Sequence, residues 1–434
     1  MATEEGQARH LDCLEYRQRL WQRPLSRKDA FKGAMGVVAT GSASSHLLLN
    51  SSVLERLGAV RAGAVPQANV LVIINQSGGN DGLNMVVPYS SQRYYKARPS
   101  LAVPAQKVLP LDSSTGLHPT MGGLKQLFMS GHLAVLQGVG YPNPDLSHFN
   151  SIIYWQTART SGQADSGWLG RYLDTALAQD QNPLKAITIG YALPMAFLSK
   201  DNATPALQNL PDFQLWTDSD GAFRKRTLQA FREMNSGQEQ NPTYAAIRTA
   251  QLTTQRAVDV LQTVPTGYQA KTEYPKTDLA KQMRLVAQLI HANLGTRVFW
   301  VEQDGYDDHA AEAVDHAKLL RELDGAISAL YGDIAAHGWD QKVMIMTWSE
   351  FGRRVEENGN RGTDHGTAAP MLLVGGSVKG GVYGQDPVLA HLDPDGNLVY
   401  RIDFRSVYRT ILERWLGADS LPVLGRSYET LPFL

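Results

Sequence analysis

From residue 69 onward, short apolar runs alternate with longer segments in which apolar residues recur at helical spacing. The short runs are continuous rather than alternating, which is typical of strands covered on both faces. They predict strands at residues 70–74, 133–137, 186–189, 297–301, 343–348 and 371–374. Strands that alternate with helices along the chain indicate an α/β fold with a largely parallel sheet.

The segments between the strands predict helices at residues 147–159, 168–178, 221–234, 244–262, 278–294 and 309–336. Apolar stripes such as Val258, Leu261 and Leu289 indicate that the helices around 205–295 form a cover over the core rather than a binding segment. No internal repeat or low-complexity linker interrupts the pattern. We therefore expect residues 67–434 to form a single α/β domain.

Composition narrows the classes of function. The chain has 434 residues, 43% of them hydrophobic and 19% charged, which is typical of a globular protein with a large core. The formal net charge of -1 gives no support to a nucleic-acid partner, which calls for concentrated positive charge. The single cysteine, Cys13, excludes an intrachain disulfide and cysteine-rich metal sites. Any metal must therefore be held by His and carboxylates.

The first 66 residues differ from the rest of the chain. Arg27, Lys28 and Phe31 precede a mildly hydrophobic Gly/Ala-rich stretch, an order that resembles a twin-arginine export signal with Lys in place of the second Arg. The alternative is an amphipathic terminal helix with Leu11 and Leu14 on its apolar face. The apolar stretch is too short for a membrane span. We expect export to the periplasm, with the cytoplasm as the alternative, and no transmembrane span.

Ligands of open parallel sheets bind outside the carboxyl ends of the strands, so the loops that leave the predicted strands are the places to search for chemistry. The first strand leads into Gly78, Gly79, Asn80 and Asp81. The glycine turn would deliver the Asp81 carboxylate to a metal ion. The alternatives are a turn in which Asn80 and Asp81 cap the backbone, or a loop whose amides cradle an anion.

The second loop opens the helix predicted at 147–159. Ser147 lies at its start, where the amides and the helix dipole stabilise an anion and favour a nucleophilic alkoxide. Ser is also a common N-cap residue, so capping is the alternative. The third loop follows the strand at 297–301 and contains Asp304, Asp307 and His309. An acidic helix start explains one Asp but leaves His309 unexplained. His316, farther along that helix, is expected on the surface.

The fourth loop leaves the strand at 343–348 and reaches Asp364 and His365, which lie between glycines. A carboxylate and an imidazole on such a turn form a natural corner for a metal ion. A capping Asp beside a solvated His is the alternative. Arg353, earlier in the loop, would bind an oxyanion through its fork of donors or pair with a neighbouring Glu.

Five motifs, taken together, resemble one family. They are Gly-Gly-Asn-Asp-Gly-Leu-Asn at 78–84, Ser-His-Phe at 147–149, Gly-Tyr-Asp-Asp-His at 305–309, Ser-Glu-Phe-Gly-Arg-Arg at 349–354 and Gly-Thr-Asp-His-Gly at 362–366. They resemble the bacterial family labelled domain of unknown function fifteen-oh-one, over about residues 69–417. The resemblance implies a doubly wound sheet sandwiched by helices, as in the alkaline-phosphatase-like and sulfatase-like superfamily, and an exported location. It implies no settled substrate.

The resemblance also implies one or two divalent ions, which we expect to be zinc, manganese or calcium. The residues that match the ligands of the first ion are Asp81, Asp364 and His365, beside Ser147 as the nucleophile. The second ion would take His309, Asp307 or Asp304, and a late His. His391 is one candidate for that late His, and His148 or Glu350 would replace it otherwise.

The expected activity is metal-dependent hydrolysis of a small anionic phosphate or sulfate ester. The ion would lower the pKa of the Ser147 hydroxyl and stabilise the leaving oxygen in an in-line displacement. Arg353, or the amides of Gly78 and Gly79, would hold the remaining anionic oxygens, and His148 would complete the catalytic group. The alternatives are a non-catalytic periplasmic binding or assembly protein, or a phospho-group transferase. The sequence predicts no particular oligomeric state.

Overall fold

The computed structural model describes residues 63–161, 165–211, 213–214, 221–236, 241–264, 267–384 and 389–434. Within them, the main sheet has the order β11-β5-β10-β9-β1-β8-β6-β7, and β12 pairs with β5. Every pairing is parallel except those of β10 with β5 and β9, which confirms the largely parallel sheet. The strands are β1 Val70–Ser77, β5 Leu133–Gly140, β6 Ala186–Ile189, β7 Ala206–Leu207, β8 Val298–Asp304, β9 Val343–Trp348, β10 Ala369–Gly375, β11 Gly381–Tyr383 and β12 Ile402–Asp403.

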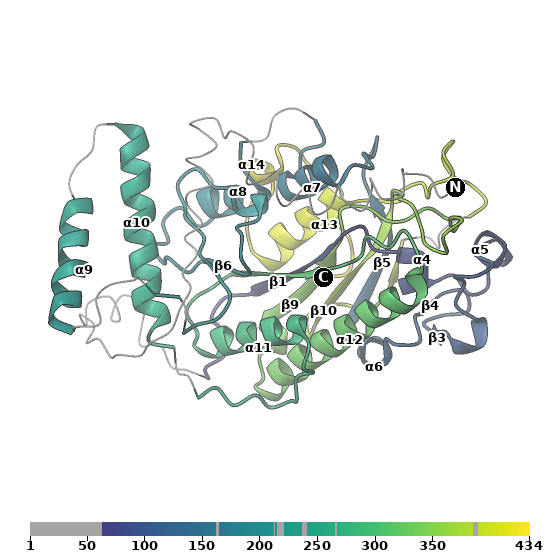
Figure 1. Cartoon of the computed structure of the whole chain (residues 1–434), viewed down its shortest axis with the longest axis horizontal. Coiled ribbons are helices and arrows are strands. Elements are labelled where there is room, and N and C mark those ends of the chain that lie inside the picture. The colour runs from purple at the N-terminus through teal and green to yellow at the C-terminus, as the bar shows by residue number, and fades with distance from the viewer. Residues whose placement is uncertain are drawn as a thin grey trace.

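Helices cover both faces of this sheet (Figure 1). One face packs against α6 Gly122–Met129, α10 Pro242–Leu261, α11 Asp278–His291 and α12 Glu312–Ala336. The other packs against α7 His148–Thr157, α8 Trp168–Thr175, α13 Phe404–Thr410, the π-helix η4 Ile411–Trp415 and α14 Leu421–Leu424. The fold class is therefore the helix-sheet-helix sandwich predicted from the sequence. No described helix combines the length and the apolar character that a membrane crossing needs.

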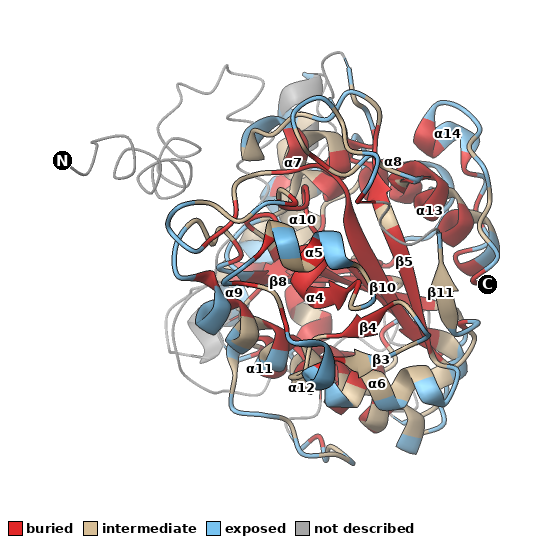
Figure 2. Ribbon diagram, turned by 90° about the vertical axis from the view of Figure 1, so that its right-hand side faces the viewer, coloured by how far each residue is buried: buried red, intermediate tan, exposed pale blue. Residues whose placement is uncertain are grey.

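Strand β1 shows why the apolar runs are continuous. Successive side chains of a strand point to opposite faces of a sheet. Accordingly, Val70, Val72 and Ile74 pack on the α11–α12 side, while Leu71 and Ile73 pack on the α7–α8 side. All five are buried, as are β5 and β10 along most of their length (Figure 2). A strand enclosed in this way has no solvent face on which to place polar residues.

A smaller sheet with the order β2-β4-β3 lies beside the main one. Its strands are β2 Val86–Val87, β3 Leu109–Pro110 and β4 Gly116–Leu117, and the helices near it are α4 Gly82–Met85 and α5 Gln92–Ala97. Short 3-10 turns occur at η1 Ala105–Lys107, η2 Met195–Phe197 and η3 Asp340–Lys342.

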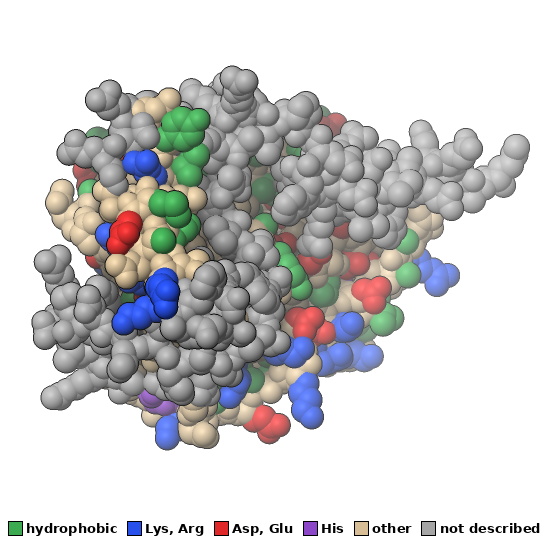
Figure 3. Space-filling view, turned by 60° about the vertical axis from the view of Figure 1, so that its left-hand side comes forward, with side chains coloured by type: hydrophobic (Ala, Val, Ile, Leu, Met, Phe, Trp, Pro, Cys, Tyr) green, Lys and Arg blue, Asp and Glu red, His purple; other side chains and the backbone are tan. Residues whose placement is uncertain are grey.

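The range 205–295, where a helical cover is predicted, contains three helices in the described residues: α9 Gly221–Asn235, α10 and α11. Arg232 of α9 pairs with Asp259 of α10 at 2.9 Å. Both helices lie at one end of the molecule in Figure 1. Figure 3 turns this side forward and shows basic, acidic and hydrophobic side chains interspersed over the described part of the surface.

Two local features place the polar loops. Strand β10 runs antiparallel to β9, so its beginning lies at the edge where the parallel strands end, and the segment that precedes it reaches that edge too. Helix α12 starts at Glu312, three residues after the predicted start, because Ala311 has a left-handed φ of 50°. His309 is therefore in a loop.

The predicted export motif, which includes Arg27, Lys28 and Phe31, lies within residues 1–62, outside the described residues.

Helix α7 is anchored to the sheet by Trp155. Its indole is 1% exposed and stacks on Phe404 at 4.4 Å and on Trp348 at 5.5 Å between ring centroids. We expect Trp155→Ala to lower the free energy of unfolding by about 3–5 kcal/mol, since it removes a large buried ring. Tyr191→Ala, at a side chain that is 72% exposed, should change it by less than about 0.5 kcal/mol. Denaturant unfolding measures both values, and equal losses would contradict the anchoring role.

Candidate metal centre

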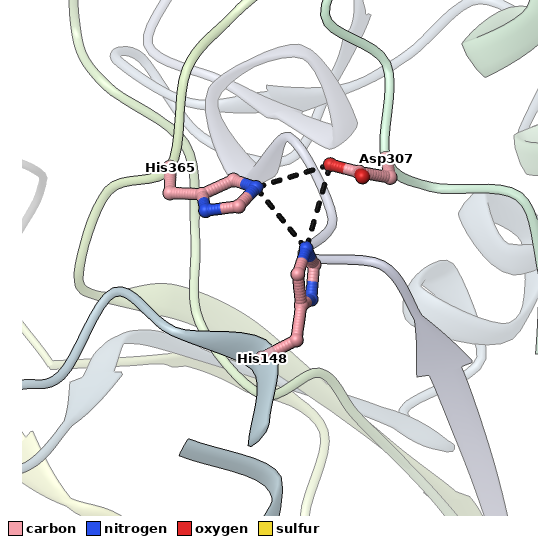
Figure 4. A group of neighbouring side chains, drawn as sticks. All are labelled: His148, Asp307 and His365. Carbon is pink, nitrogen blue, oxygen red and sulfur yellow. Dashed lines mark hydrogen bonds and ion pairs between the residues drawn. The ribbon is translucent and has the colours of Figure 1, made fainter. Parts of the chain in front are cut away.

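Side chains from three separate segments meet beyond the carboxyl ends of β8 and β9. His148 comes from the first residue of α7, Asp307 from the loop after β8, and His365 from the loop before β10. Figure 4 shows the three side chains pointing toward one another. Their side chains are 15%, 21% and 23% exposed, so the group is open to solvent on one side.

The spacing of the donor atoms suits a small metal ion. His365 Nε2 lies 3.1 Å from His148 Nε2 and 3.1 Å from Asp307 Oδ1, and the remaining side of the triangle is 3.6 Å. Ligands at ordinary zinc distances in a tetrahedral site lie about 3.3–3.6 Å apart. The triangle therefore has the size of one face of such a site, before any ion has drawn the ligands into place.

His309 adds a fourth donor on the same side. Its Nε2 lies 3.0 Å from Asp307 Oδ1 and 3.1 Å from His365 Nε2. The group thus combines three imidazoles and one carboxylate, a donor set typical of zinc and other divalent first-row metals. These donors are of the two types, His and carboxylate, to which the sequence limits a metal site.

The outer nitrogens of the three rings set their tautomers. His148 Nδ1 is 2.8 Å from Glu350 Oε1, His309 Nδ1 is 3.0 Å from Asp364 Oδ1, and His365 Nδ1 is 2.9 Å from the carbonyl oxygen of Leu146. A carbonyl and an ionised carboxylate only accept hydrogen bonds, so each Nδ1 carries the proton. In a neutral ring Nε2 then turns a lone pair toward the centre, whereas Nε2 of the protonated His148 ring carries a proton that a metal ion would displace. Histidines that bind metals are arranged in this way.

The charges of the group reinforce one another. Burial alone would raise the pKa of Asp307, but its contacts with the ring nitrogens of His148, His309 and His365 and the charge of Arg353 hold it well below its usual range. Burial alone would lower the pKa of His148, but Asp307 and Glu350 raise it to about 9. Burial lowers the pKa of His365. An arriving ion therefore meets a fixed carboxylate and must displace a proton from His148.

The segment that follows β9 packs against two of these histidines. The Phe351 ring packs against the rings of His148 and His365, with centroids 4.8 Å and 4.6 Å away. Gly79 lies against the same phenyl ring with a φ of +79°, and a Cβ there would overlap the ring. This glycine is thus required both by its backbone conformation and by its close approach to Phe351.

A family model with the description "Protein of unknown function (DUF1501)" matches residues 68–404. The chain belongs to this family. The match spans the motifs that supply His148, Asp307, His309 and His365, so the DUF1501 region contains the whole centre.

No curated protein matches the sequence of this DUF1501 chain. Solved structures that resemble it include Ps i-CgsB in complex with k-i-k-neocarrahexaose (TM-score 0.38, 10% identity, 84% of this chain and 75% of that chain). Others are the PsFucS1 sulfatase from Pseudoalteromonas sp. (0.36, 12%, 85% and 70%) and the C-terminal periplasmic domain of EcEptC from Escherichia coli in complex with Zn (0.30, 11%, 71% and 73%). With TM-scores below 0.5, they decide nothing about the activity of this chain.

Arg353 of the DUF1501 chain directs its donors into the protein rather than toward a substrate oxyanion, contrary to one sequence expectation, and its Nη1 also lies 3.4 Å from His309 Nε2. Its side chain is fully buried and donates to the carbonyl oxygens of Gly79 at 2.6 Å, Thr363 at 2.8 Å and Tyr306 at 2.9 Å. It also donates to Gly78 O and, at 2.7 Å, to Asp307 Oδ1. The guanidinium therefore links three loops of the centre instead of facing solvent.

In the other expected anion cradle, formed by the amides of Gly78 and Gly79, the Gly78 amide is already used inside the protein. The amide of Gly78 donates to Glu350 Oε1 at 2.9 Å, and the amide of Asn80 donates to Ser349 Oγ at 2.9 Å. These bonds hold the glycine loop against the end of β9. The loop is therefore a structural support beneath the histidines.

Asp81 and Asp364 do not take the ligand positions expected for them. Asp364 orients His309 through the bond to Nδ1, and Asn358 holds the same Asp364 oxygen at 3.2 Å. Asp81 forms a two-pronged ion pair with the buried Arg98, at 2.5 Å and 2.8 Å. This pair keeps the pKa of Asp81 below its usual range in spite of burial.

Asp81 instead belongs to a second, buried group with Glu312 and His316, whose ligand-type atoms all lie within 4.8 Å of one another. Burial and the nearby Asp81 raise the pKa of Glu312 to about 9, and burial lowers that of His316 to about 4. At neutral pH the group therefore holds two neutral side chains and one ion pair with Arg98. It is balanced without a metal ion. His316, expected on the surface, is 2% exposed and bonds to Asn80 Oδ1 at 2.9 Å.

Ser147 stands directly beside the metal centre in the chain. The residue before it, Leu146, gives its carbonyl to His365, and the residue after it is His148. Ser147 occupies the N-cap position of α7, yet its side chain makes no capping hydrogen bond. The Ser147 hydroxyl therefore does not cap the helix, which was the alternative role for this residue. His391, the other late His considered, is exposed and has no contact with the centre among those the structure describes.

We expect the protein to bind one divalent ion per chain, because only the partly exposed group brings several imidazole nitrogens together, whereas the buried group holds two neutral side chains and one ion pair. Titration of metal-free protein with zinc, followed by elemental analysis, measures the number. Affinity should rise as the pH increases toward 9, since protons compete for the His148 ring, whose pKa is about 9 in the ion-free protein. Two tightly bound ions, or an affinity that does not vary with pH, would contradict this assignment.

A second prediction concerns Glu312. Its pKa is raised from 4.5 to about 9, so the stability it contributes is complete below 4.5 and is lost as the pH rises toward 9. Glu312→Gln keeps the neutral shape at every pH. The variant should gain stability relative to the wild type between about pH 5 and about pH 9 in denaturant unfolding. The exposed Glu273→Gln is the control, and a parallel pH profile for both variants would show that Glu312 is ionised.

Proposed function

We propose that this DUF1501 protein hydrolyses phosphate or sulfate esters, with one divalent metal ion held by His148, Asp307, His365 and His309. The observation that carries the proposal is the convergence of three Nε2 atoms and Asp307 Oδ1, each ring fixed by an acceptor at its Nδ1. A bound ion would supply positive charge that screens the ester and favours ionisation of a neighbouring hydroxyl.

Ser147 is the proposed nucleophile. The first turn of a helix has amides without partners inside the helix, and the dipole places partial positive charge there. The Ser147 oxygen, at the start of α7 and free of any capping bond, is supported as it gains negative charge. Attack on phosphorus or sulfur would form a bond to Ser147 Oγ and break the bond to the leaving oxygen, which takes up the proton that the Ser147 hydroxyl releases. Water then releases the acid and restores the serine.

The anionic oxygens of the ester must be held without Arg353 and Gly78, whose donors are used inside the protein. Positive potential for these oxygens would come from the ion and from the amides in the first turn of α7. This arrangement favours a substrate with a compact charged group. His148 belongs to both the proposed ligand set and the helix start, because it is a proposed ligand and the first residue of α7.

We expect Ser147→Ala to lower kcat by at least about 10³-fold on any ester that the wild type hydrolyses, since it removes the attacking oxygen. Its metal content should stay the same, because no ligand changes. The measurement is a panel of phosphate monoesters, phosphate diesters and sulfate esters with metal-loaded protein, and Ser130→Ala on α6 is the matched control. Unchanged hydrolysis in Ser147→Ala would exclude this nucleophile. A metal-loaded wild type inactive on the whole panel would favour a binding or assembly role.

A further inference from the structure

Glu350 is completely buried just beneath the centre, and the proposed hydrolysis gives it no chemical step. Its Oε1 accepts two hydrogen bonds, from His148 Nδ1 at 2.8 Å and from the Gly78 amide at 2.9 Å. Its Oε2 lies 3.2 Å from Ser349 Oγ, whose single proton is shared with the closer carbonyl oxygen of Gln76 at 2.7 Å. A carboxylate that is held by several donors in this way has little freedom to turn.

The backbone of Glu350 is fixed as firmly as its side chain. Ser151 of α7 donates its hydroxyl to the Glu350 carbonyl oxygen, and the Tyr141 hydroxyl lies 2.8 Å from Ser151 Oγ. The helix that carries His148 is thus bonded to Glu350 at two points, one through the ring and one through Ser151. A displacement of Glu350 would move the direction in which Nε2 of His148 points.

The three rings differ in the partner of their outer nitrogen. His365 has a neutral carbonyl, and His309 has Asp364, whose side chain is 42% exposed and screened by water. The side chain of Glu350 is 1% exposed, so its charge acts on His148 through a medium of low dielectric constant. Among these partners, Glu350 has the strongest electrostatic effect on a ring that faces the ion.

We propose that Glu350 is a positioning residue that fixes the tautomer and direction of His148 and, through the ring, sets how tightly the centre holds its metal ion. The inference rests on the metal ion of the proposed function, but not on hydrolysis or on Ser147. An acceptor that withdraws the Nδ1 proton toward itself makes Nε2 a stronger donor. Loss of the charge weakens the bond from His148 to the ion while leaving the ligand in place.

Glu350→Gln is the sharpest test, because the side chain keeps its shape. The amide oxygen can still accept from His148 and Gly78, and the amide N–H can donate to Ser349 Oγ, so mainly the charge is removed. We expect the affinity for zinc and for cobalt(II), measured by competition with a chelator, to fall about 10- to 100-fold. The visible absorption of the cobalt(II) form should shift, which a merely structural role would not produce.

Two matched variants complete the experiment. Glu356→Gln changes an exposed residue of the same segment and should leave affinity and spectrum unchanged. Asp364→Asn removes the exposed partner of His309 and should cost less affinity than Glu350→Gln. If Glu350→Gln fails to fold, Glu350→Asp replaces it, since the shorter arm withdraws the carboxylate from Nδ1 and should also lower the affinity.

The outcomes separate this inference from the proposed function. A wild type that binds the ion but hydrolyses no ester removes the hydrolase proposal, and the Glu350 variants still decide the role of Glu350. Wild-type affinity and an unchanged cobalt(II) spectrum in Glu350→Gln would overturn the positioning role, as would an equal or larger loss in Asp364→Asn. A wild type that binds no divalent ion would overturn both.

Discussion

The centre depends on one buried guanidinium. Arg353 donates to backbone carbonyls of the loops after β1, after β8 and before β10, and its remaining donors meet Asp307. A buried charge is costly unless its hydrogen bonds are made, so the loops that satisfy Arg353 are held in the only arrangement that does so. His309, Asp307 and His365 lie on these loops. Their convergence therefore follows from satisfying a single cation.

Two clusters of titratable groups lie close together, but their charges are compensated in different ways. The group of Asp81, Glu312 and His316 is balanced by Arg98 and by neutral side chains. In the partly exposed group, the Nε2 atoms of three imidazoles converge on one carboxylate oxygen. Lone pairs that face one another repel unless a proton or a metal ion lies between them. The difference explains why only one cluster is a candidate for catalysis.

The sequence predicted the fold well because burial on both sides of the sheet leaves continuous apolar runs. It placed the end of β1 too early, since Asn75 and Gln76 are polar although buried. The proximity of His309 and His365 could be predicted because they follow or precede strands at one edge of the sheet. Asp81 and Arg353 were placed in the right loops, but their partners were not foreseen. Arg98, which forms the ion pair with Asp81, lies in a segment without any motif. A pairing between residues of separate segments leaves no local pattern in the sequence.

The proposed ligands come from widely separated parts of the chain, and His148 and His365 are 217 positions apart in the sequence. An ion bound by both therefore closes a very long loop, as a crosslink would. None of the individual segments contains a complete set of ligands, so a nascent chain has no site until β10 has joined the sheet. If the proposed ion binds, it can then be loaded only after this edge of the sheet has formed, and its presence would report that these distant segments have come together.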